Sequence, residues 1–332
     1  MRALMKAMVQ TGYGPPDVLE LTELEQPVPR GNEVLIKVHA ASINEWDWGR
    51  LRGTPLVNRA MFGFFRPRAK HRILGCDISG RVESVGARAE RFQPGDAVFG
   101  DLSRSGWGGF AEYVCAREDA LAIKSPRMSF AQAAAMPQAG LLALQGLRKG
   151  GIKRGQRVLV NGAGGGVGTF AIPIAKSIGA EVTGVDSRAK LDVMRSVGAD
   201  HVLDYAEDDF TRSGETYDLI LDVMARRSLA DYRRALKPGG MCVLVGGSTS
   251  VIQQAMMFGS LGAKKIKLLL HKPDPDDLAH MNALYEEGTF VPNIDRSYGL
   301  DELVEAFRYY ESGHHKGKLV VTMVLDEQRP RP

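Results

Sequence analysis

Residues 156–190, QRVLVNGAGGGVGTFAIPIAKSIGAEVTGVDSRAK, decide the fold of this chain. The stretch opens with RVLV, an apolar, valine-rich run that is typical of a buried parallel strand. The glycine-rich turn GAGGGVG follows, and residues 167–178 predict a helix with small and apolar residues on most faces. A second apolar run, EVTGV, ends at Asp186, which comes 18 residues after Gly168. This order predicts the first half of a dinucleotide-binding βαβ unit.

The glycines of the turn have a physical role. A pyrophosphate must approach the backbone amides at the start of the helix, where the helix dipole and free N–H groups favour an anion. A Cβ on the turn would hold the phosphate away. The spacing is Gly162-x-x-Gly165-x-x-Gly168, not the literal G-x-G-x-x-G, but its place between two strands favours dinucleotide binding over a plain glycine turn. The predicted backbone contacts are Gly164, Gly165, Gly166 and Val167.

Length and composition limit the possible classes of protein. A chain of 332 residues exceeds one ordinary domain, so we expect two. The net charge of +4 does not favour a nucleic-acid partner. Three widely spaced cysteines form no metal or disulfide pattern, which fits a reducing cytoplasm. Residues 1–9 lack the apolar core of a signal peptide, and the most apolar run, 133–147, is too short and interrupted to span a membrane. We therefore expect a cytoplasmic protein with no nucleic-acid and no membrane partner.

The pattern of predicted elements changes near residue 126. Before it, strands are predicted at 34–40, 78–85, 96–99 and 111–114, and closely spaced Gly and Pro residues indicate a small barrel or sandwich. After it, strands and helices alternate, which predicts a six-stranded doubly wound domain. The predicted strands there are 157–160, 181–185, 202–203, 219–221, 242–245 and 266–270, and further helices are predicted at 129–135, 190–197 and 229–236. Helices at 277–286 and 300–310 and a strand at 319–324 return to the first domain.

Motifs in this order resemble the zinc-independent, quinone-oxidoreductase-like branch of the medium-chain dehydrogenase/reductase superfamily. They cover nearly the whole chain, which is more specific than any one of them. The motifs are residues 38–44 (VHAASIN) with 47–48 (DW), 75–82 (GCDISGRV), 95–100 (GDAVFG), 108–113 (GGFAEY), 136–140 (MPQAG), 161–168 (NGAGGGVG) and 317–321 (GKLVV).

The resemblance implies an α/β protein with a GroES-like β-barrel domain plus a Rossmann-type doubly wound parallel sheet. The expected boundaries are 1–125 for the GroES-like catalytic domain, completed by 272–332, and 126–271 for the Rossmann NAD(P)-binding domain. The family places its active site in the cleft between these domains. We also expect a homodimer.

Two departures from the wider superfamily concern the metal. Zinc alcohol dehydrogenases carry a Cys ligand in the loop where this chain has residues 44–48, and a His-Glu pair where it has Cys76 and Asp77. The four-cysteine structural zinc lobe is also missing. A catalytic zinc needs three protein ligands, which Cys76 and Asp77 alone cannot supply, so no metal is expected. Without a Lewis acid, reduction of an electron-poor acceptor is favoured over alcohol oxidation.

The expected acceptor is therefore a quinone or an α,β-unsaturated carbonyl, reduced by NAD(P)H. Hydride delivery to such a conjugated system places negative charge on a remote oxygen, which a few hydrogen-bond donors can stabilise. The cofactor performs the hard chemistry and the protein orients it. Two alternatives remain open: an enoyl thioester reductase, and a non-enzymatic NADPH-binding protein of the crystallin type.

The resemblance also suggests residues on the substrate side. Asn44 matches the family's asparagine near the nicotinamide and can donate to a developing oxyanion, or it only forms a turn. Asp47 matches the family's Asn-x-x-Asp pattern, or it only braces the loop. Trp46 and Trp48 either wall the pocket or fill the core. The apolar-then-basic residues 61–72 form either a substrate lid or surface packing beside a solvated basic face.

The residues suggested on the cofactor side favour different cofactors. Ser187, Arg188 and Lys190 can clasp a 2′-phosphate, whereas Asp186 normally grips a ribose 2′-OH and repels that phosphate. NADPH is the expected cofactor, with NADH possible. The remaining expected contacts are Tyr205 near the adenosine, Val223, Gly246, Gly247, Leu269, Leu270 and His271 at the ends of later strands, and Lys318, which can reach the phosphates.

Overall fold

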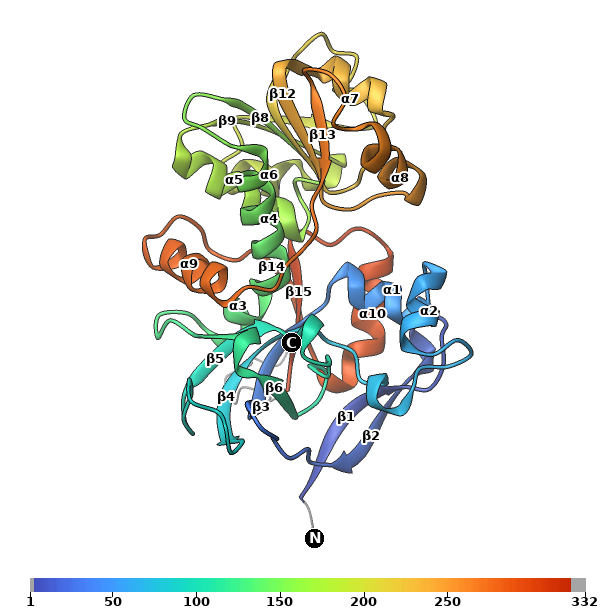
Figure 1. Ribbon diagram of the computed structural model, residues 1–332, viewed down its shortest axis with the longest axis vertical. Coiled ribbons are helices and arrows are strands. Elements are labelled where there is room, and N and C mark those ends of the chain that lie inside the picture. Colours follow the sequence, from blue (N-terminus) through green and yellow to red (C-terminus); the bar gives the residue numbers. More distant parts are fainter. Residues whose placement is uncertain (1–2, 324–332) are drawn as a thin grey trace. The chain divides into compact units, whose positions relative to one another are not determined.

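The computed structural model of this chain describes residues 3–323 and contains two compact units (Figure 1). Of the described residues, unit 1 contains 3–138, Pro273–Glu286 and 294–323, and unit 2 contains Ala139–Lys272 and Glu287–Asn293. Within the described residues, no helix is long and apolar enough to cross a membrane.

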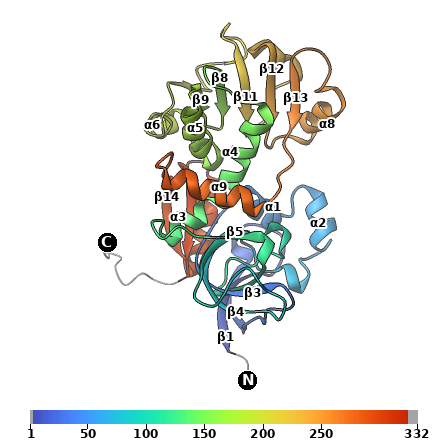
Figure 2. The same ribbon diagram turned by 60° about the vertical axis from the view of Figure 1, so that its left-hand side comes forward.

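Unit 2 contains a six-stranded, wholly parallel sheet in the order β10-β9-β8-β11-β12-β13, and Figure 2 shows β8, β11, β12 and β13 side by side. Counted from its first strand, the order is 3-2-1-4-5-6, the doubly wound Rossmann order, so this prediction is confirmed. The order reverses between β8 and β11, where a ligand site is expected. The strands are β8 (Arg157–Asn161), β9 (Glu181–Asp186), β10 (His201–Asp204), β11 (Tyr217–Asp222), β12 (Leu236–Leu244) and β13 (Lys265–Leu268).

The helices of unit 2 pack closely on this sheet. A Cβ on Gly146 of α4 would lie 2.5 Å from the Leu221 side chain, so the helix contacts β11 at a distance that only glycine permits without a shift. In α5, residues 168–175 are all buried, as its apolar sequence predicts. The helices are α4 (Pro137–Gly150), α5 (Gly166–Ile178), α6 (Leu191–Ser196), α7 (Leu229–Ala235) and α8 (Thr249–Phe258).

Unit 1 is built on a mostly antiparallel sheet in the order β14-β15-β3-β4-β5-β7, with β6 also paired to β3. Beside it lies the β1–β2 hairpin, and α10 lies next to α1, where Trp48 Nε1 donates to Glu311 Oε1 at 2.9 Å (Figure 1). The strands are β1 (Leu4–Gln10), β2 (Leu19–Glu25), β3 (Glu33–Ser42), β4 (Asp77–Val85), β5 (Ala97–Asp101), β6 (Tyr113–Arg117), β7 (Leu121–Ile123), β14 (Ile294–Gly299) and β15 (Lys318–Thr322). The helices are α1 (Glu45–Arg52), α2 (Leu56–Phe62), α3 (Phe130–Ala135), α9 (Pro275–Glu286) and α10 (Leu303–Glu311).

The unit boundaries differ from those predicted. Residues 126–138 belong to unit 1 rather than to the Rossmann domain, because α3 packs on β3 and β4 and Ser79 Oγ donates to Phe130 O at 2.6 Å. Residues 287–293 belong to unit 2, where the Phe290 ring meets the Phe170 ring edge to face at 5.2 Å. The composition shift at residue 126 therefore marks a change of secondary structure and not the end of unit 1.

Two segments expected as loops contain helices. α1 begins directly after Asn44 because the Asp47 carboxylate accepts the Asn44 N–H at 3.0 Å, as the third residue of a capping box does. α2 occupies part of the predicted 61–72 loop and the residues before it. The strand predicted at 266–270 ends at Leu268, and the strand predicted at 319–324 is Lys318–Thr322, with Val324 outside the described residues.

Candidate active site

A buried polar cluster lies at one edge of the unit 1 sheet. Asn44 follows β3, Asp77 opens β4 and Lys318 opens β15. The register places Ser42 opposite Asp77 on one side and opposite Val320 on the other. Three segments that are distant in sequence therefore meet at neighbouring strand ends.

The amide of Asn44 is oriented by opposite charges. Its Oδ1 accepts from the Lys318 ammonium at 2.5 Å, and its Nδ2 donates to Asp77 Oδ2 at 2.9 Å. The other contacts of Nδ2 are weak: it lies 3.4 Å from Cys76 Sγ, which is a poor acceptor, and 3.5 Å from Ser42 O. One amide hydrogen is thus firmly held and the second is weakly held. The catalytic role of Asn44 stays a prediction, but Asn44 does more than form a turn.

Lys318 belongs to this cluster and not to an open phosphate site. Its side chain is 3 % exposed. The ammonium donates to Asn44 and to Ile43 O at 3.1 Å, and it lies 3.7 Å from Asp77 Oδ2. A contact with a cofactor phosphate would require these interactions to break. The structure therefore corrects the expected place of Lys318, because spacing alone did not reveal its partners.

Asp47 is fully buried and holds the local backbone. Its two oxygens accept from Asn44 N at 3.0 Å and from Gly75 N at 2.8 Å. Burial raises the pKa of Asp47 to about 7, while the Gly75 N–H, the Asn44 N–H and the Arg50 charge oppose that rise. Of the two roles considered, the geometry favours the brace.

The tryptophans next to Asp47 differ from each other. Trp48 packs against the core of unit 1 and donates to Glu311. Trp46 is 41 % exposed. Core filling therefore describes Trp48, and Trp46 lies at the surface of its unit.

Cys76, Asp77 and Asp101 are buried, with ligand-type atoms within 4.8 Å of one another. Sequence analysis missed Asp101, which the β4–β5 pairing places opposite Asp77. The donor set does not fit a catalytic zinc. Burial and the nearby carboxylates raise the pKa of the Cys76 thiol well above its ordinary value.

Asp77 is already satisfied by other groups. It accepts from Gln138 N at 3.1 Å and 3.2 Å, from Ser42 Oγ at 3.2 Å and from Asn44. Burial raises its pKa to about 6, and the Lys318 ammonium opposes that rise. A cation therefore stands beside the carboxylate where a metal would need to bind.

In unit 2, the glycine turn is open at Gly165. A Cβ on Gly168 would lie 2.4 Å from the Ala163 backbone, and one on Gly164 would lie 2.5 Å from Lys190 Cβ. A Cβ on Gly165 would meet only Gly162 O, at 3.5 Å. Gly165 caps α5, which begins at Gly166. The turn therefore leaves room for an anion at the amino end of this helix, which fits a pyrophosphate.

Asp186 is tied to the glycine turn. Its Oδ2 accepts from Gly164 N at 2.9 Å and its Oδ1 from Ser187 N at 2.8 Å. Lys190 Nζ lies 3.8 Å from Asp186 Oδ1, and both side chains are nearly buried. Arg188 is 78 % exposed and pairs with Glu207 at 2.9 Å. The two basic residues expected to bind a 2′-phosphate thus lie in different environments: Arg188 is exposed, whereas Lys190 faces Asp186.

The other expected cofactor residues of unit 2 lie at the carboxyl ends of the parallel strands, as the fold requires. Asn161 Nδ2 donates to Asp222 Oδ1 at 3.0 Å across the point where the strand order reverses. Sequence analysis missed this pair, although both residues end strands. The expected residues found at these ends are Tyr205 after β10, Val223 after β11, Gly246 and Gly247 after β12, and Leu269, Leu270 and His271 after β13.

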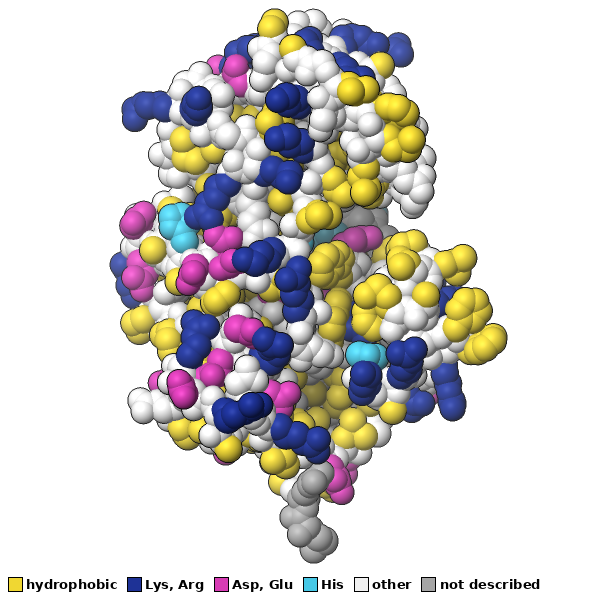
Figure 3. Space-filling view, viewed as in Figure 1, with side chains coloured by type: hydrophobic (Ala, Val, Ile, Leu, Met, Phe, Trp, Pro, Cys, Tyr) yellow, Lys and Arg dark blue, Asp and Glu magenta, His cyan; other side chains and the backbone are white. Residues whose placement is uncertain are grey.

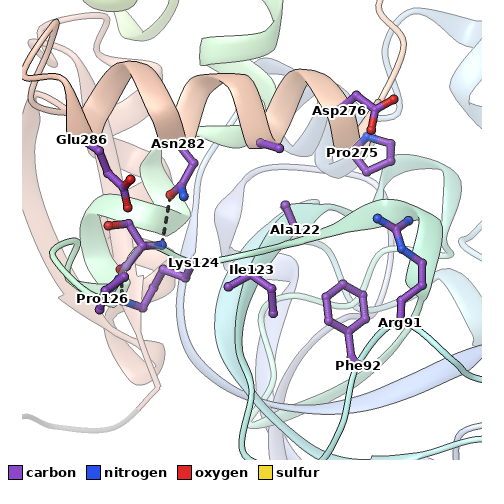
Figure 4. A pocket seen from close by; sticks show the side chains of 12 residues that line it. Arg91, Phe92, Ala122, Ile123, Lys124, Pro126, Pro275, Asp276, Asn282 and Glu286 are labelled. Atoms are coloured by element: carbon purple, nitrogen blue, oxygen red, sulfur yellow. Dashed lines mark hydrogen bonds between the residues drawn. The ribbon is translucent and has the colours of Figure 1, made fainter.

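A separate cavity of about 410 Å³ lies beside α9 (Figure 4). Its wall includes Lys124, Glu286 and Asn282, whose Oδ1 accepts from Ser125 N at 3.0 Å. None of the expected site residues lines it. The cavity therefore takes no part in the candidate site.

Gly165→Val should abolish NADPH binding and leave the fold intact. The backbone at Gly165 has φ −90° and ψ −174°, which any residue adopts, and its side chain would fill the anion space. Gly168→Val is the matched control and should destabilise unit 2 through its clash with Ala163. Fluorescence titration and circular dichroism measure the two effects. Unchanged affinity in the folded Gly165→Val variant would contradict the site.

Comparison with known proteins agrees with this architecture. Residues 30–127 match the model of the alcohol dehydrogenase GroES-like domain, and residues 197–321 match that of the zinc-binding dehydrogenases. The chain is 32% identical to the chloroplast envelope quinone oxidoreductase homolog of Arabidopsis thaliana, over 96% of this chain and 98% of that protein. It is 31% identical to a 2-methylene-furan-3-one reductase of Solanum lycopersicum, over 96% and 79%.

The solved structure of the quinone oxidoreductase from Coxiella burnetii matches with a TM-score of 0.89 and 32% identity, over 97% of this chain and 100% of that one. The chain therefore belongs to the medium-chain dehydrogenase/reductase superfamily, in its quinone-oxidoreductase-like branch.

Proposed function

We propose that this protein is an NAD(P)H-dependent reductase of quinones or α,β-unsaturated carbonyls that works without a metal. The observation that carries the proposal is the buried Lys318 ammonium, held between Asn44 and Asp77 in the cluster described above. The names of the relatives, which include quinone oxidoreductases and an NADPH-dependent alkenal/one oxidoreductase, support this class of acceptor.

Unit 2 holds the cofactor in this proposal. The amino end of α5 and the amides around Gly165 bind the pyrophosphate, and residues around Asp186 contact the adenosine ribose. When bound, NAD(P)H supplies the hydride. The strand ends at Val223 and Gly246 support the nicotinamide half.

Unit 1 stabilises the charge that develops on the acceptor oxygen. Lys318 polarises the amide of Asn44 through Oδ1, which strengthens the amide hydrogens as donors. One of these hydrogens is held by Asp77, and the weakly held one donates to the oxyanion. Lys318 and Asp77 act as positioning residues, because both are buried and act through Asn44. Such fixed donors need little rearrangement during the reaction.

The finer parts of the proposal are NADPH as the preferred cofactor, a cytoplasmic location and a homodimer. The exposed edge of the unit 2 sheet supports the dimer, since β13 pairs only with β12 among the described strands. An enoyl thioester reductase and a non-enzymatic NADPH-binding protein remain the alternatives that the assay below separates.

NADPH oxidation should be fast with quinones or enones and slow with enoyl thioesters. Asn44→Ala should lower kcat about 100-fold, the usual effect of removing one oxyanion donor. Asn58→Ala is the matched control, because the side-chain amide of Asn58 on α2 donates to the nearby Thr54 O. Absorbance at the NADPH band measures each rate. Turnover only with enoyl thioesters, or with no acceptor, would select one of the alternatives.

Purified protein should carry no stoichiometric zinc, and chelators should leave its activity unchanged, because Asp77 already accepts hydrogen bonds and the Lys318 ammonium lies 3.7 Å from its carboxylate. Elemental analysis of protein grown with added zinc measures this. Lys318→Met, which removes the cation, provides the comparison with the highest expected zinc content. One tightly held zinc in the unaltered chain would contradict the metal-free mechanism.

Arg188→Ala should raise the KM for NADPH about fivefold, since an exposed charged contact is worth about 1 kcal/mol, and should leave the KM for NADH unchanged. Arg188 is the exposed cation nearest Asp186 in sequence, whereas Lys190 faces Asp186. Arg195→Ala, at another exposed arginine that is paired with Asp192, is the control. Equal effects on both cofactors would show that Arg188 does not read the 2′-phosphate.

A further inference from the structure

Unit 1 carries an apolar surface that its own core does not cover. No residue of α2 is buried. Leu56 is 70% exposed and Phe65 is 90% exposed. Val57, Met61 and Phe64 are also exposed. Figure 3 shows apolar side chains gathered over α1 and α2. We call residues 54–72 the apolar–basic projection. Contiguous apolar exposure of this kind marks an interaction surface.

The charge of this region has one sign. Between Trp48 and Cys76 the sequence holds seven Arg or Lys residues and no Asp or Glu. Arg66, Arg68 and Lys70 are exposed and form no ion pair within residues 3–323. In Figure 3, Lys and Arg side chains lie next to the apolar patch. A partner that fits this surface would therefore combine an apolar phase with negative charge.

The base of the apolar–basic projection is firmly anchored. The Arg50 guanidinium lies between the Phe62 and Trp107 rings, 4.1 Å from each centroid, and donates to His71 O at 2.9 Å. Tyr13 OH donates to Gly63 O at 2.7 Å. The outward direction of Phe64 and Phe65 is thus set by a packed base, and their exposure is not that of a frayed end.

We propose that the apolar–basic projection docks on the surface of an anionic lipid bilayer. Phe64, Phe65 and Met61 would enter the boundary between head groups and acyl chains, while Arg66, Arg68 and Lys70 contact anionic head groups. A short helix that exposes apolar residues and is bordered only by cations fits this phase, because it needs no concave partner and no acidic side chains of matching shape. No membrane partner was expected from the sequence because it contains no segment that could span a membrane. Docking on the surface requires no such segment.

The inference goes beyond the proposed function and is tested without cofactor or acceptor. The full chain should sediment with phosphatidylcholine vesicles that contain phosphatidylserine and stay in solution with phosphatidylcholine alone, and added salt should weaken binding. Phe65→Ser should weaken it at least tenfold. The triple change of Arg66, Arg68 and Lys70 to Ala should weaken it more, about fivefold for each cation removed.

Two controls separate this surface from general attraction. Changing Lys149, Lys153 and Arg154 together to Ala removes the same charge from an exposed part of unit 2 and should have little effect. Met256→Ser removes an exposed apolar side chain that is 73% accessible on α8 and should also have little effect. Circular dichroism verifies that each variant is folded.

Three results would overturn the proposal. They are no binding to the phosphatidylserine vesicles, an equal loss of binding in the unit 2 control, and a change of oligomeric state in Phe65→Ser with unchanged vesicle binding. The last result would assign the surface to a second copy of the chain.

Discussion

The buried contact between Lys318 and its two partners ties the fold of unit 1 to its chemistry. An ammonium that is removed from water must be paired and hydrogen-bonded, and Lys318 finds Asn44 and Asp77 at the ends of two neighbouring strands. The same contact joins β15 to β3 and β4. Loss of one partner leaves a buried charge uncompensated, which costs about 3–5 kcal/mol. In the proposed reaction, stability and catalysis therefore depend on the same atoms.

Unit 2 shows a similar double use of a charged residue. Asp186 occupies the position that normally grips a ribose 2′-OH, yet both of its oxygens accept backbone N–H groups and Lys190 stands beside it. Part of its negative charge is therefore compensated within the unit, and its repulsion of a 2′-phosphate is weaker than the motif suggests. The same arrangement leaves Arg188 as the exposed cation of the pair. The sequence favoured NADPH at the basic residues and NADH at Asp186. In the structure, Arg188 is the exposed residue on which this choice depends.

The features that the sequence predicted correctly depend on residues that are close together along the chain. The glycine turn, α5 and the six-stranded order follow from alternating apolar runs and from close packing at Gly168. The missed features depend on pairing between remote segments: Asp101 reaches the cluster only through the register of β4 and β5, and Lys318 only through that of β15 and β3. α1 was missed because one side chain, Asp47, starts it. Of the candidate site, sequence named Asn44 but not the charges that orient it.

The nature of these charges also bears on the choice of acceptor. A bound metal contacts an oxygen directly and can stabilise a localised alkoxide. In this cluster the positive charge lies behind the Asn44 amide and is partly balanced by Asp77, so the field at an acceptor oxygen is weaker. A conjugated acceptor spreads the incoming charge over several atoms and needs less stabilisation than a simple ketone does. In the proposed mechanism, the donor set of unit 1 therefore favours quinones and enones over isolated carbonyls, whose localised alkoxides would need a stronger field.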